Sequence, residues 1–341
     1  MGPSTSHREV SFTHIISSGS VRIALSMLLL LIVPSVAFSQ LQRTECPPPP
    51  LAPTLEEVQA MLNTSPDRGF LWRYDKQGYG GYLYGSIHVS RREWMVPGPN
   101  TMAALKASKV IALELDVLDP EIQRQLVGLP GSGSSRVVLP PALQRRMDIL
   151  AERVCAPIDA LSSLHPVMQL TTMAILQARF SNLEVGYGTE LFLSGFGRGA
   201  KVPIKSLETP ELQMKALISE SDALVLEAIG SGLTLLEKGE QGKVTDRLVR
   251  AWATSNLSEL ERYEEWCECA VTEADRQYLR RLLDDRNPHL AAGIDRLSRE
   301  GRPVFAAVGS LHMIGPHSVP RLLEKMGYTI QRVSFEERPP R

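Results

Sequence analysis

The sequence has no excess of either charge sign. It contains 37 Lys and Arg residues against 38 Asp and Glu residues, so its formal net charge is −1, and its pI is about 6.7. Proteins that bind nucleic acid carry basic patches that neutralise phosphates, and no long basic run occurs here. We therefore expect no nucleic-acid partner.

Cysteine is also scarce, with only Cys46, Cys155, Cys267 and Cys269 among 341 residues. The hydrophobic fraction of 43% is large enough to build a sizeable core for one large or two ordinary domains. In an oxidising compartment the four thiols would form one or two disulfides, and three full pairings are open. Cys267 and Cys269 could instead be half of a zinc site, but no second Cys or His pair is spaced to complete it.

Long hydrophobic runs are absent except near the start of the chain. Residues 23–33 are apolar, Arg8 and Arg22 precede them, and the small-residue pattern Ala37-Phe38-Ser39 follows. This order predicts an export signal cleaved after Ser39, because the run is shorter than the roughly 20 apolar residues that span a membrane. The long segment before Arg22 leaves two alternatives open, a wrongly assigned start and an uncleaved anchor that would hold the protein at a membrane.

This pattern divides the chain into three parts. We expect residues 1–39 to be a signal peptide and the mature protein to be exported, either periplasmic or secreted. Residues 40–66 are expected to be a proline-rich linker and N-terminal segment, in which the four prolines after Cys46 act as a stiff spacer. Residues 67–336 then form a single domain.

One stretch near the C-terminus is typical of a buried strand that ends in a turn. Residues 304–308 are apolar without polar alternation, which suits a strand covered on both faces, and Gly309-Ser310-Leu311-His312 follows. Ser318 can cap the next helix, Gly327 supplies a left-handed stop, and residues 328–333 return as a strand. This order is one β-α-β unit.

The same order occurs near the start of the domain. Residues 82–84 lead into Gly85-Ser86-Ile87-His88, a helix is expected at 100–107, and the apolar strand 110–113 ends at Glu114. The glycines just before residue 82 predict a hairpin that gives the first strand a partner. The chain thus repeats strand, Gly-x-x-His, helix and strand.

A third unit places another glutamate at a strand end. The strand expected at 202–207 leads to Glu208, and Thr209-Pro210 then starts a helix with a cap and a proline in its first turn. A later helix starts at Asn287-Pro288, and Arg286 stands at its entrance. Glu208 therefore ends its strand much as Glu114 does.

The middle of the chain is expected to be helical cover for the sheet. Helical patterning fills 141–180, where Pro157 and Pro166 break it, and His165 is interpreted as structural. A second helical region runs from 210 to about 285. The fold class is therefore α/β (α+β): a central mixed sheet with Gly-x-x-His turns at strand ends, flanking helices and a largely helical middle region.

Four ionisable residues are predicted at the carboxyl ends of strands: His88, His312, Glu114 and Glu208. In open α/β sheets these ends carry the ligand site, so the two histidines should share one crevice if their strands are neighbours. Two imidazoles with carboxylates suit a divalent metal in an open site, namely Mn, Co, Fe or Zn. The alternative is that each histidine only caps its strand, and the repetition of the motif favours the shared site.

Ser86 and Ser310 each lie two residues before a histidine, which suggests a Ser–His hydrolase. Neither serine lies in a Gly-x-Ser-x-Gly elbow, and a serine and a histidine this close in sequence rarely reach the geometry of nucleophile and base. We therefore expect a helper role, in which each serine bonds a ligand or orients a histidine.

Taken together, these motifs resemble the TraB/GumN family, which includes the Tiki metalloproteases. The resemblance runs from about residue 71 to 333 and is carried by Gly85-Ser86-Ile87-His88, Glu114, Gly188-Thr189-Glu190, Leu207-Glu208-Thr209, Arg286-Asn287 and Gly309-Ser310-Leu311-His312. It implies the fold shared by the haem-linked ChaN and the erythromycin esterases, with both histidines and the glutamates in the site. The sequence departs from the usual bacterial pattern at His165-Pro166-Val167 and at Glu190, and neither departure touches the paired histidines.

The leading hypothesis is an exported hydrolase that depends on a divalent metal. His88, His312, Glu114 and Glu208 would bind the metal, and Glu114, Glu208 and Arg286 would be catalytic, with Arg286 stabilising developing negative charge. The resemblance implies a peptide or amide bond as substrate. The alternative is a non-catalytic protein of the cell envelope that binds a metal, haem or a protein partner, because both histidines would serve either role.

Overall fold

The computed structural model describes residues 46–128, 137–162, 164–267 and 269–335. Six strands form one sheet in the order β4-β3-β5-β2-β1-β6. Their bounds are β1 Phe70–Lys76, β2 Tyr79–Ser86, β3 Val110–Leu113, β4 Ile204–Ser206, β5 Val304–Gly309 and β6 Thr329–Val333. The sheet is mixed and flanked by helices, which confirms the α/β class, whereas the narrower likeness to ChaN and the erythromycin esterases stays a prediction.

The first two strands form the expected hairpin. β1 and β2 pair antiparallel, and the turn between them is Gln77-Gly78, in which both residues have positive φ. Two such residues match the twist of a two-residue hairpin turn. Gly81 lets the hairpin approach β5, because a Cβ there would lie 1.9 Å from the carbonyl oxygen of Val304.

Four neighbouring strands, β4, β3, β5 and β2, run parallel. Their carboxyl ends therefore meet at one edge of the sheet. The centre of this group is shielded from solvent, because β3 is buried throughout and β5 is buried from Val304 to Val308. This burial confirms the strand that the apolar run at 304–308 predicted.

The last strand closes the opposite edge of the sheet. β6 pairs antiparallel with β1, so the whole hairpin lies between β6 and β5. The crossover is helix α16, Val319–Lys325, where Ser318 occupies the N-cap position without a side-chain hydrogen bond and Gly327 has the expected positive φ. The predicted β-α-β unit is present, but its two strands are not neighbours.

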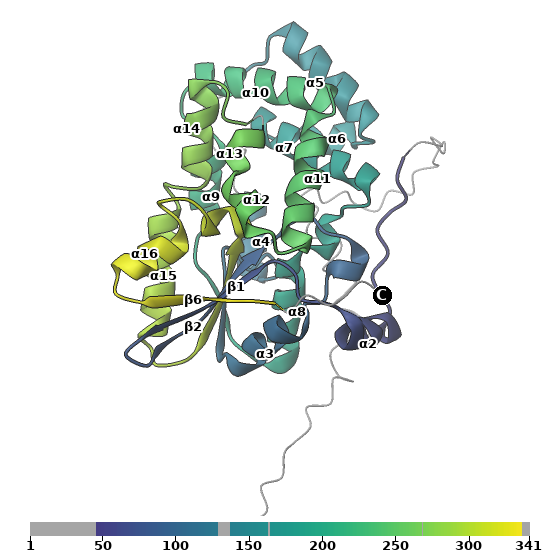
Figure 1. The fold of residues 1–341 in the computed structure, drawn as a ribbon. Helices are drawn as coiled ribbons and strands as arrows, with labels where there is room; N and C mark the ends of the chain where they lie inside the picture. Colours follow the sequence, from purple (N-terminus) through teal and green to yellow (C-terminus); the bar gives the residue numbers. More distant parts are fainter. Residues whose placement is uncertain (1–45, 129–136, 163, 268, 336–341) are drawn as a thin grey trace, which may run out of the picture.

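Helices cover both faces of the sheet. α15, Asn287–Ser298, and α16 lie on one side, and α3, Pro99–Ala107, and α8, Thr189–Ala200, lie on the other (Figure 1). The apolar core between these layers includes the buried side chains of Tyr84, Leu105, Ile111, Phe305 and Ile294. A parallel sheet buried on both faces requires such cover.

A second, all-helical group lies at one end of the sheet (Figure 1). α5, Pro141–Arg153, α7, Pro166–Ala178, and α10, Asp222–Glu237, enclose an apolar core of their own. The other helices are α2 Leu55–Thr64, α4 Pro120–Gly128, α6 Ile158–Leu161, α9 Pro210–Leu217, α11 Glu240–Ala253, α12 Leu257–Glu261, α13 Tyr263–Trp266 and α14 Glu273–Leu282. The helical middle region predicted from the sequence is therefore confirmed.

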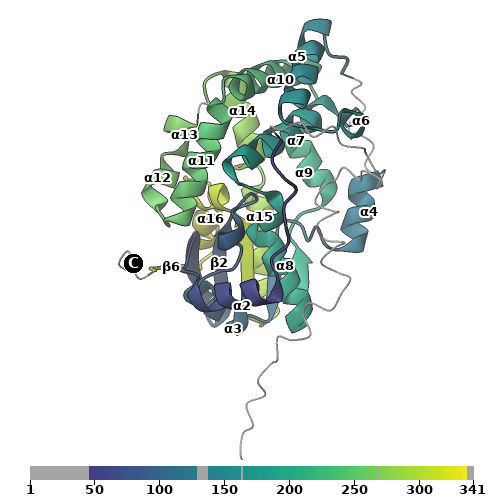
Figure 2. The same cartoon turned by 90° about the vertical axis from the view of Figure 1, so that its right-hand side faces the viewer.

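The proline-rich segment after Cys46 is held along the surface of the protein, where it runs from α2 toward the helical group (Figure 2). Cys46 is disulfide-bonded to Cys155, just after α5, across 109 residues. Arg179 donates hydrogen bonds to the carbonyl oxygens of two of the prolines, and the Tyr187 hydroxyl donates to a third carbonyl of the segment. The stretch expected to be a spacer is thus fixed to residues far along the chain.

The remaining two cysteines are also paired, since Cys267 and Cys269 form the second disulfide. This pairing replaces the alternative of a Cys-x-Cys metal pair. Two disulfides are compatible with an oxidising compartment. Within the described ranges, every helix is too short or too polar to span a bilayer. The signal predicted at 1–39 lies outside those ranges, so export and the domain boundaries stay predictions.

His165 caps a helix, in line with its structural interpretation. Its Nδ1 atom accepts a hydrogen bond of 3.2 Å from the backbone N–H of Val167 at the start of α7, and the residue is 5% exposed. Burial lowers the pKa of His165 below its ordinary value, and Asp222 opposes this only in part. The fold therefore favours the neutral form of His165.

Stability should fall as the pH drops below about 6.5, the pKa of an unperturbed histidine, because the unfolded chain then binds a proton that folded His165 resists. His165→Asn keeps a capping acceptor but does not titrate. Between about pH 7.5 and 5.5, we expect the wild type to lose up to about 1 kcal/mol more free energy of unfolding in urea than His165→Asn. Equal losses in the two proteins would contradict this account.

Candidate active site

The parallel strands deliver the predicted site residues to one edge of the sheet. β3 lies beside β4, so Glu114 and Glu208 follow adjacent strand ends, and the backbone N–H of Glu208 donates to the carbonyl oxygen of Glu114 at 3.0 Å. On the other side of β5, β2 ends at Ser86, which is paired with Gly309. The two Gly-x-x-His turns therefore lie side by side.

Glu114 is an ionised acceptor in this edge. Its Oε1 atom accepts from the backbone N–H of Gly309 at 2.6 Å, and its Oε2 atom accepts from Arg286 Nη2 at 2.5 Å. Burial alone would raise the pKa of this carboxyl. The two neighbouring histidines, Arg286 and the N–H of Gly309 outweigh burial, so the pKa of Glu114 is lowered to about 2.

Arg286 joins Glu114 to Glu208. Arg286 Nε donates to Glu208 Oε1 at 2.9 Å, Nη2 donates to Glu208 Oε2 at 2.6 Å, and Gln213 also donates to Oε2. Burial alone would lower the pKa of Arg286, but the two carboxylates raise it. The guanidinium therefore stays positively charged. Arg286 is the N-cap residue of α15, the position predicted from the sequence.

His312 is the buried histidine of the pair. It lies in the short turn η5, Ser310–Met313, is 3% exposed, and its Nδ1 atom lies 2.6 Å from Asn287 Oδ1. Because an amide oxygen can only accept, Nδ1 carries the proton and Nε2 keeps its lone pair. Burial lowers the pKa of His312 to about 4, so the ring is neutral at neutral pH. Its Nε2 atom lies 3.9 Å from Glu114 Oε1.

His88 is the exposed histidine of the pair. Its side chain is 66% exposed, and its Nδ1 atom lies 3.0 Å from Glu190 Oε1. Ser86 Oγ donates to the same carboxylate oxygen at 2.5 Å. The negative charge of Glu190 raises the pKa of His88 to about 9. The two histidines therefore differ, one accessible and paired with a carboxylate, the other buried and paired with an amide.

The start of α8 contacts the backbone of the first Gly-x-x-His turn, residues 85–88, and this contact places Glu190 next to His88. The backbone N–H of Thr189 donates to the carbonyl oxygen of Ile87 at 3.1 Å. A Cβ on Gly188 would lie 2.5 Å from the carbonyl oxygen of His88, so only glycine permits this approach. The Gly-Thr-Glu sequence thus sets one partner of His88.

Three of the predicted donor groups surround Gly309. A Cβ built on Gly309 would lie 3.2 Å from Glu114 Oε1, 3.5 Å from His88 Nε2 and 3.6 Å from His312 Cδ2. All three groups therefore lie close to the Cα side of Gly309 and close to one another. Glu208 belongs to the same edge of the sheet but bonds to Arg286 instead.

No group of three or more His, Cys, Asp or Glu side chains in the described part of the chain is arranged to hold a metal ion. Arg286 forms ion pairs with both carboxylates, at 2.5 Å from Glu114 Oε2 and 2.6 Å from Glu208 Oε2. The assignment of His88, His312, Glu114 and Glu208 as metal ligands therefore stays a prediction.

Sequence reasoning gave no role to Glu190 or Asn287, although each stands in a motif quoted for the family resemblance. Both are partners of a histidine Nδ1 atom, which only the tertiary structure shows. Neither serine donates to a histidine in the described hydrogen bonds: Ser86 donates to Glu190, and Ser310 Oγ donates to the carbonyl oxygen of Ser86 at 2.8 Å. Ser86 thus bonds the carboxylate partner of His88, whereas Ser310 bonds the backbone, and the helper role stays a prediction for both serines.

Together, the fold and the site define an α/β protein with a cluster of histidine, glutamate and arginine at the carboxyl edge of parallel strands. The model of the TraB/PrgY/gumN family matches residues 70–332, and the chain belongs to this family. The chain is also similar to a protein named metalloprotease TIKI homolog from Nematostella vectensis, with 22% identity over an alignment of 341 positions that covers 83% of this chain and 71% of that protein. No solved structure matches the chain. The resemblance read from the sequence motifs is therefore confirmed.

Proposed function

We propose that this protein is a hydrolase of peptide or amide bonds whose site is formed by His88, His312, Glu114 and Arg286. One observation carries the proposal: two imidazoles and a carboxylate oxygen surround Gly309, and a guanidinium cation contacts that carboxylate. Acid, base and cation placed together at the carboxyl edge of a sheet are what hydrolysis of a carbonyl compound requires.

The donor set fits a divalent ion in part. Both histidines have an acceptor on Nδ1, an arrangement that orients imidazole ligands, and a metal on His88 would replace the Nε2 proton that the ring otherwise carries at neutral pH. Two imidazoles and one carboxylate are a donor set of zinc and iron sites, and Mn and Co fit as well. A divalent ion held there would lower the pKa of a water and polarise a carbonyl. We therefore propose His88, His312 and Glu114 as the ligands.

Glu208 fits a different role. Both of its carboxylate oxygens already accept hydrogen bonds from Arg286, and its side chain is 1% exposed. A carboxylate in this position fixes the guanidinium in one orientation. We propose that Glu208 positions Arg286, and that Arg286 stabilises negative charge on the oxygen of the attacked carbonyl.

His88 gives the site its access. Its side chain is largely exposed, whereas Glu114 and His312 are buried. A substrate would therefore approach the cluster from the His88 side, with its reacting carbonyl next to the His88 ring. Glu190 and Ser86 hold the His88 ring in place during this approach.

The peptide or amide bond and the location of the protein rest on indirect support. The relative from Nematostella vectensis carries the name metalloprotease, which favours peptide bonds. The apolar run at 23–33 and the two disulfides favour export to the periplasm or the medium, with membrane association if the signal stays uncleaved. The balanced charge gives no support for a nucleic-acid partner.

A second candidate is a non-catalytic binder of a metal, of haem or of a protein partner. The observation that favours it is the pairing of both glutamates with Arg286. A carboxylate in an ion pair is a weaker base, and catalysis of hydrolysis would need a base. Both histidines would serve such a binder equally well. Metal content and cleavage, measured together, separate the two functions.

The test uses the mature protein exported by its own signal. We expect elemental analysis to find roughly one Mn, Co, Fe or Zn ion per chain, and a peptide library to be cleaved in a reaction that EDTA abolishes and the same metal restores. His317→Ala is the matched control, because His317 is exposed, close in sequence to His312 and outside the site. Bound metal without cleavage that EDTA abolishes would favour the binder, and the absence of both would contradict the proposed function.

A further inference from the structure

The disulfide between Cys267 and Cys269 adds little to the stability of the fold. Its cysteines are 2 positions apart, whereas Cys46 and Cys155 are 109 positions apart. In the chain-entropy account a cross-link stabilises a protein according to the length of the loop that it closes. The long loop therefore raises the folding equilibrium constant roughly 200-fold more than the short one. Opening the short disulfide therefore removes little of the stability that loop closure supplies.

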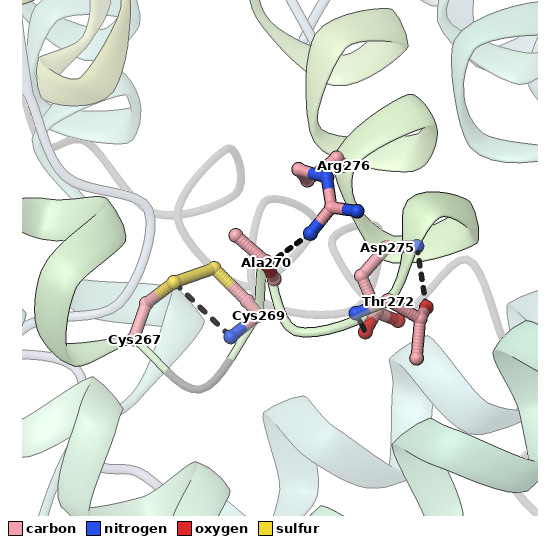
Figure 3. The surroundings of a disulfide bond; sticks show 6 residues. All are labelled: Cys267, Cys269, Ala270, Thr272, Asp275 and Arg276. Carbon is pink, nitrogen blue, oxygen red and sulfur yellow. Dashed lines mark hydrogen bonds between the residues drawn. A yellow bond between two sulfur atoms is a disulfide. The ribbon is translucent and has the colours of Figure 1, made fainter.

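Other contacts hold both sides of this disulfide. On the N-terminal side, the N–H of Cys267 bonds to the carbonyl oxygen of Tyr263 at 2.9 Å and so ends α13. On the C-terminal side, Thr272 and Asp275 form a reciprocal capping box that starts α14. Arg276 of α14 reaches back to the carbonyl oxygen of Ala270 (Figure 3) and also donates to the carbonyl oxygen of Val271. The backbone geometry on each side therefore does not depend on the S–S bond.

The two cysteines differ in burial and in surroundings. Cys267 is 1% exposed, whereas Cys269 is half-buried. The backbone N–H of Cys269 donates to Cys267 Sγ at 3.1 Å. A hydrogen bond from a backbone N–H stabilises a thiolate more than a thiol, which makes Cys267 the better leaving group.

From these contacts we propose that Cys267–Cys269 is a thiol–disulfide exchange site that accepts two electrons from a dithiol and is entered at Cys269. The proposal goes beyond the hydrolase function and does not depend on it. The partner is a peptide or protein dithiol of an oxidising compartment, defined by its chemistry alone. The site uses no residue of the candidate active site.

The exchange balances in two steps. A thiolate of the partner attacks Cys269 Sγ, a new S–S bond forms between them, the bond to Cys267 breaks, and its electron pair leaves on Cys267 as a thiolate. The second thiolate of the partner then attacks the partner's first sulfur, the one that is bonded to Cys269 in the mixed disulfide. The partner leaves as a disulfide, Cys269 leaves as a thiolate, and the pair is reduced by two electrons.

The first experiment reduces the native protein in a graded series of dithiothreitol buffers, alkylates free thiols, and identifies each cysteine by peptide mass spectrometry. Cys46–Cys155 is the internal control in the same molecule. We expect Cys267–Cys269 to become reduced while Cys46–Cys155 stays oxidised and the near-ultraviolet circular dichroism stays native. The proposal is overturned if both pairs are reduced only together as the native signal is lost, or if Cys267–Cys269 resists reduction until the protein is denatured.

The second experiment tests the direction of entry with two single variants. Cys267→Ser leaves Cys269 as the free thiol, and Cys269→Ser leaves Cys267. With glutathione disulfide as the probe, we expect Cys269 to form the mixed disulfide at least roughly tenfold faster than Cys267, because Cys269 is the less buried of the two residues. Equal rates in two folded variants would overturn the assigned entry point. Neither readout uses peptide hydrolysis, so failure here is distinct from failure of the proposed function.

Discussion

Replacing Arg286 by methionine should lower the free energy of unfolding by about 3–5 kcal/mol. Arg286 is the shared partner of Glu114 and Glu208, whose side chains are 8% and 1% exposed. Methionine fills part of the volume but leaves two carboxylates in a buried place without their cation, and removing one partner of a buried ion pair leaves an uncompensated charge. Equilibrium unfolding in urea, with the slope m compared between variants, measures the loss.

Two further variants test whether charge is the cause. Arg286→Lys keeps a cation but not the planar fork that bonds both carboxylates, so it should lose less stability than Arg286→Met. Glu208→Gln in the Arg286→Met background removes one of the two orphaned charges and should recover part of the loss. A loss below about 1 kcal/mol for Arg286→Met would show that the carboxylates find water or a proton without the arginine.

The strands around the site could be predicted because burial leaves a plain signal in the sequence. An apolar run such as 304–308 suits only an element covered on both faces, and the structure buries it fully. The position of β6 could not be predicted. The helix after β5 predicts only that the chain returns to the sheet. The returning strand β6 pairs with β1, and no local sequence pattern predicts that β1 has a free edge.

The site was only partly accessible to sequence reasoning, for a similar reason. Strand ends at Glu114, Glu208 and the two Gly-x-x-His turns follow from local patterns, and parallel strands bring such ends to one edge. The contacts of their side chains are not local. Arg286 contacts Glu114 across 172 positions, and Asn287 contacts His312 across 25. Local patterns therefore predict where these carboxylates lie but not that an arginine pairs with them.

The pairing of the cysteines also could not be predicted from local sequence patterns. Four cysteines allow three pairings, and the pairing depends on where the segment after Cys46 runs. That segment lies against the protein because Arg179 and Tyr187 bind its carbonyl oxygens. A proline-rich composition predicts an extended backbone but says nothing about what the backbone touches.

Alanine at either His88 or His312 should reduce peptide hydrolysis by roughly 10³-fold and remove the bound metal. Both rings lie beside Gly309, so we expect each single change to remove the same site rather than half of it. The double variant should therefore be no less active than either single variant, because residues that act as a unit are not additive. Metal content by elemental analysis and the rate of cleavage of a library-derived peptide measure both effects.

His88→Ala and His312→Ala should differ in their free energy of unfolding. The position of both histidines at strand ends would suggest that neither ring packs against much of the protein, but their burial differs. His88 is largely exposed, so His88→Ala should change the free energy of unfolding by no more than about 0.5 kcal/mol. His312 is 3% exposed and bonds Asn287, so His312→Ala should cost about 1–3 kcal/mol. Asn287→Ala should weaken metal binding by only about 10–100-fold, since it frees the His312 ring without removing a ligand. If instead the losses of activity add in the double variant while the metal content stays unchanged, the two turns are independent caps.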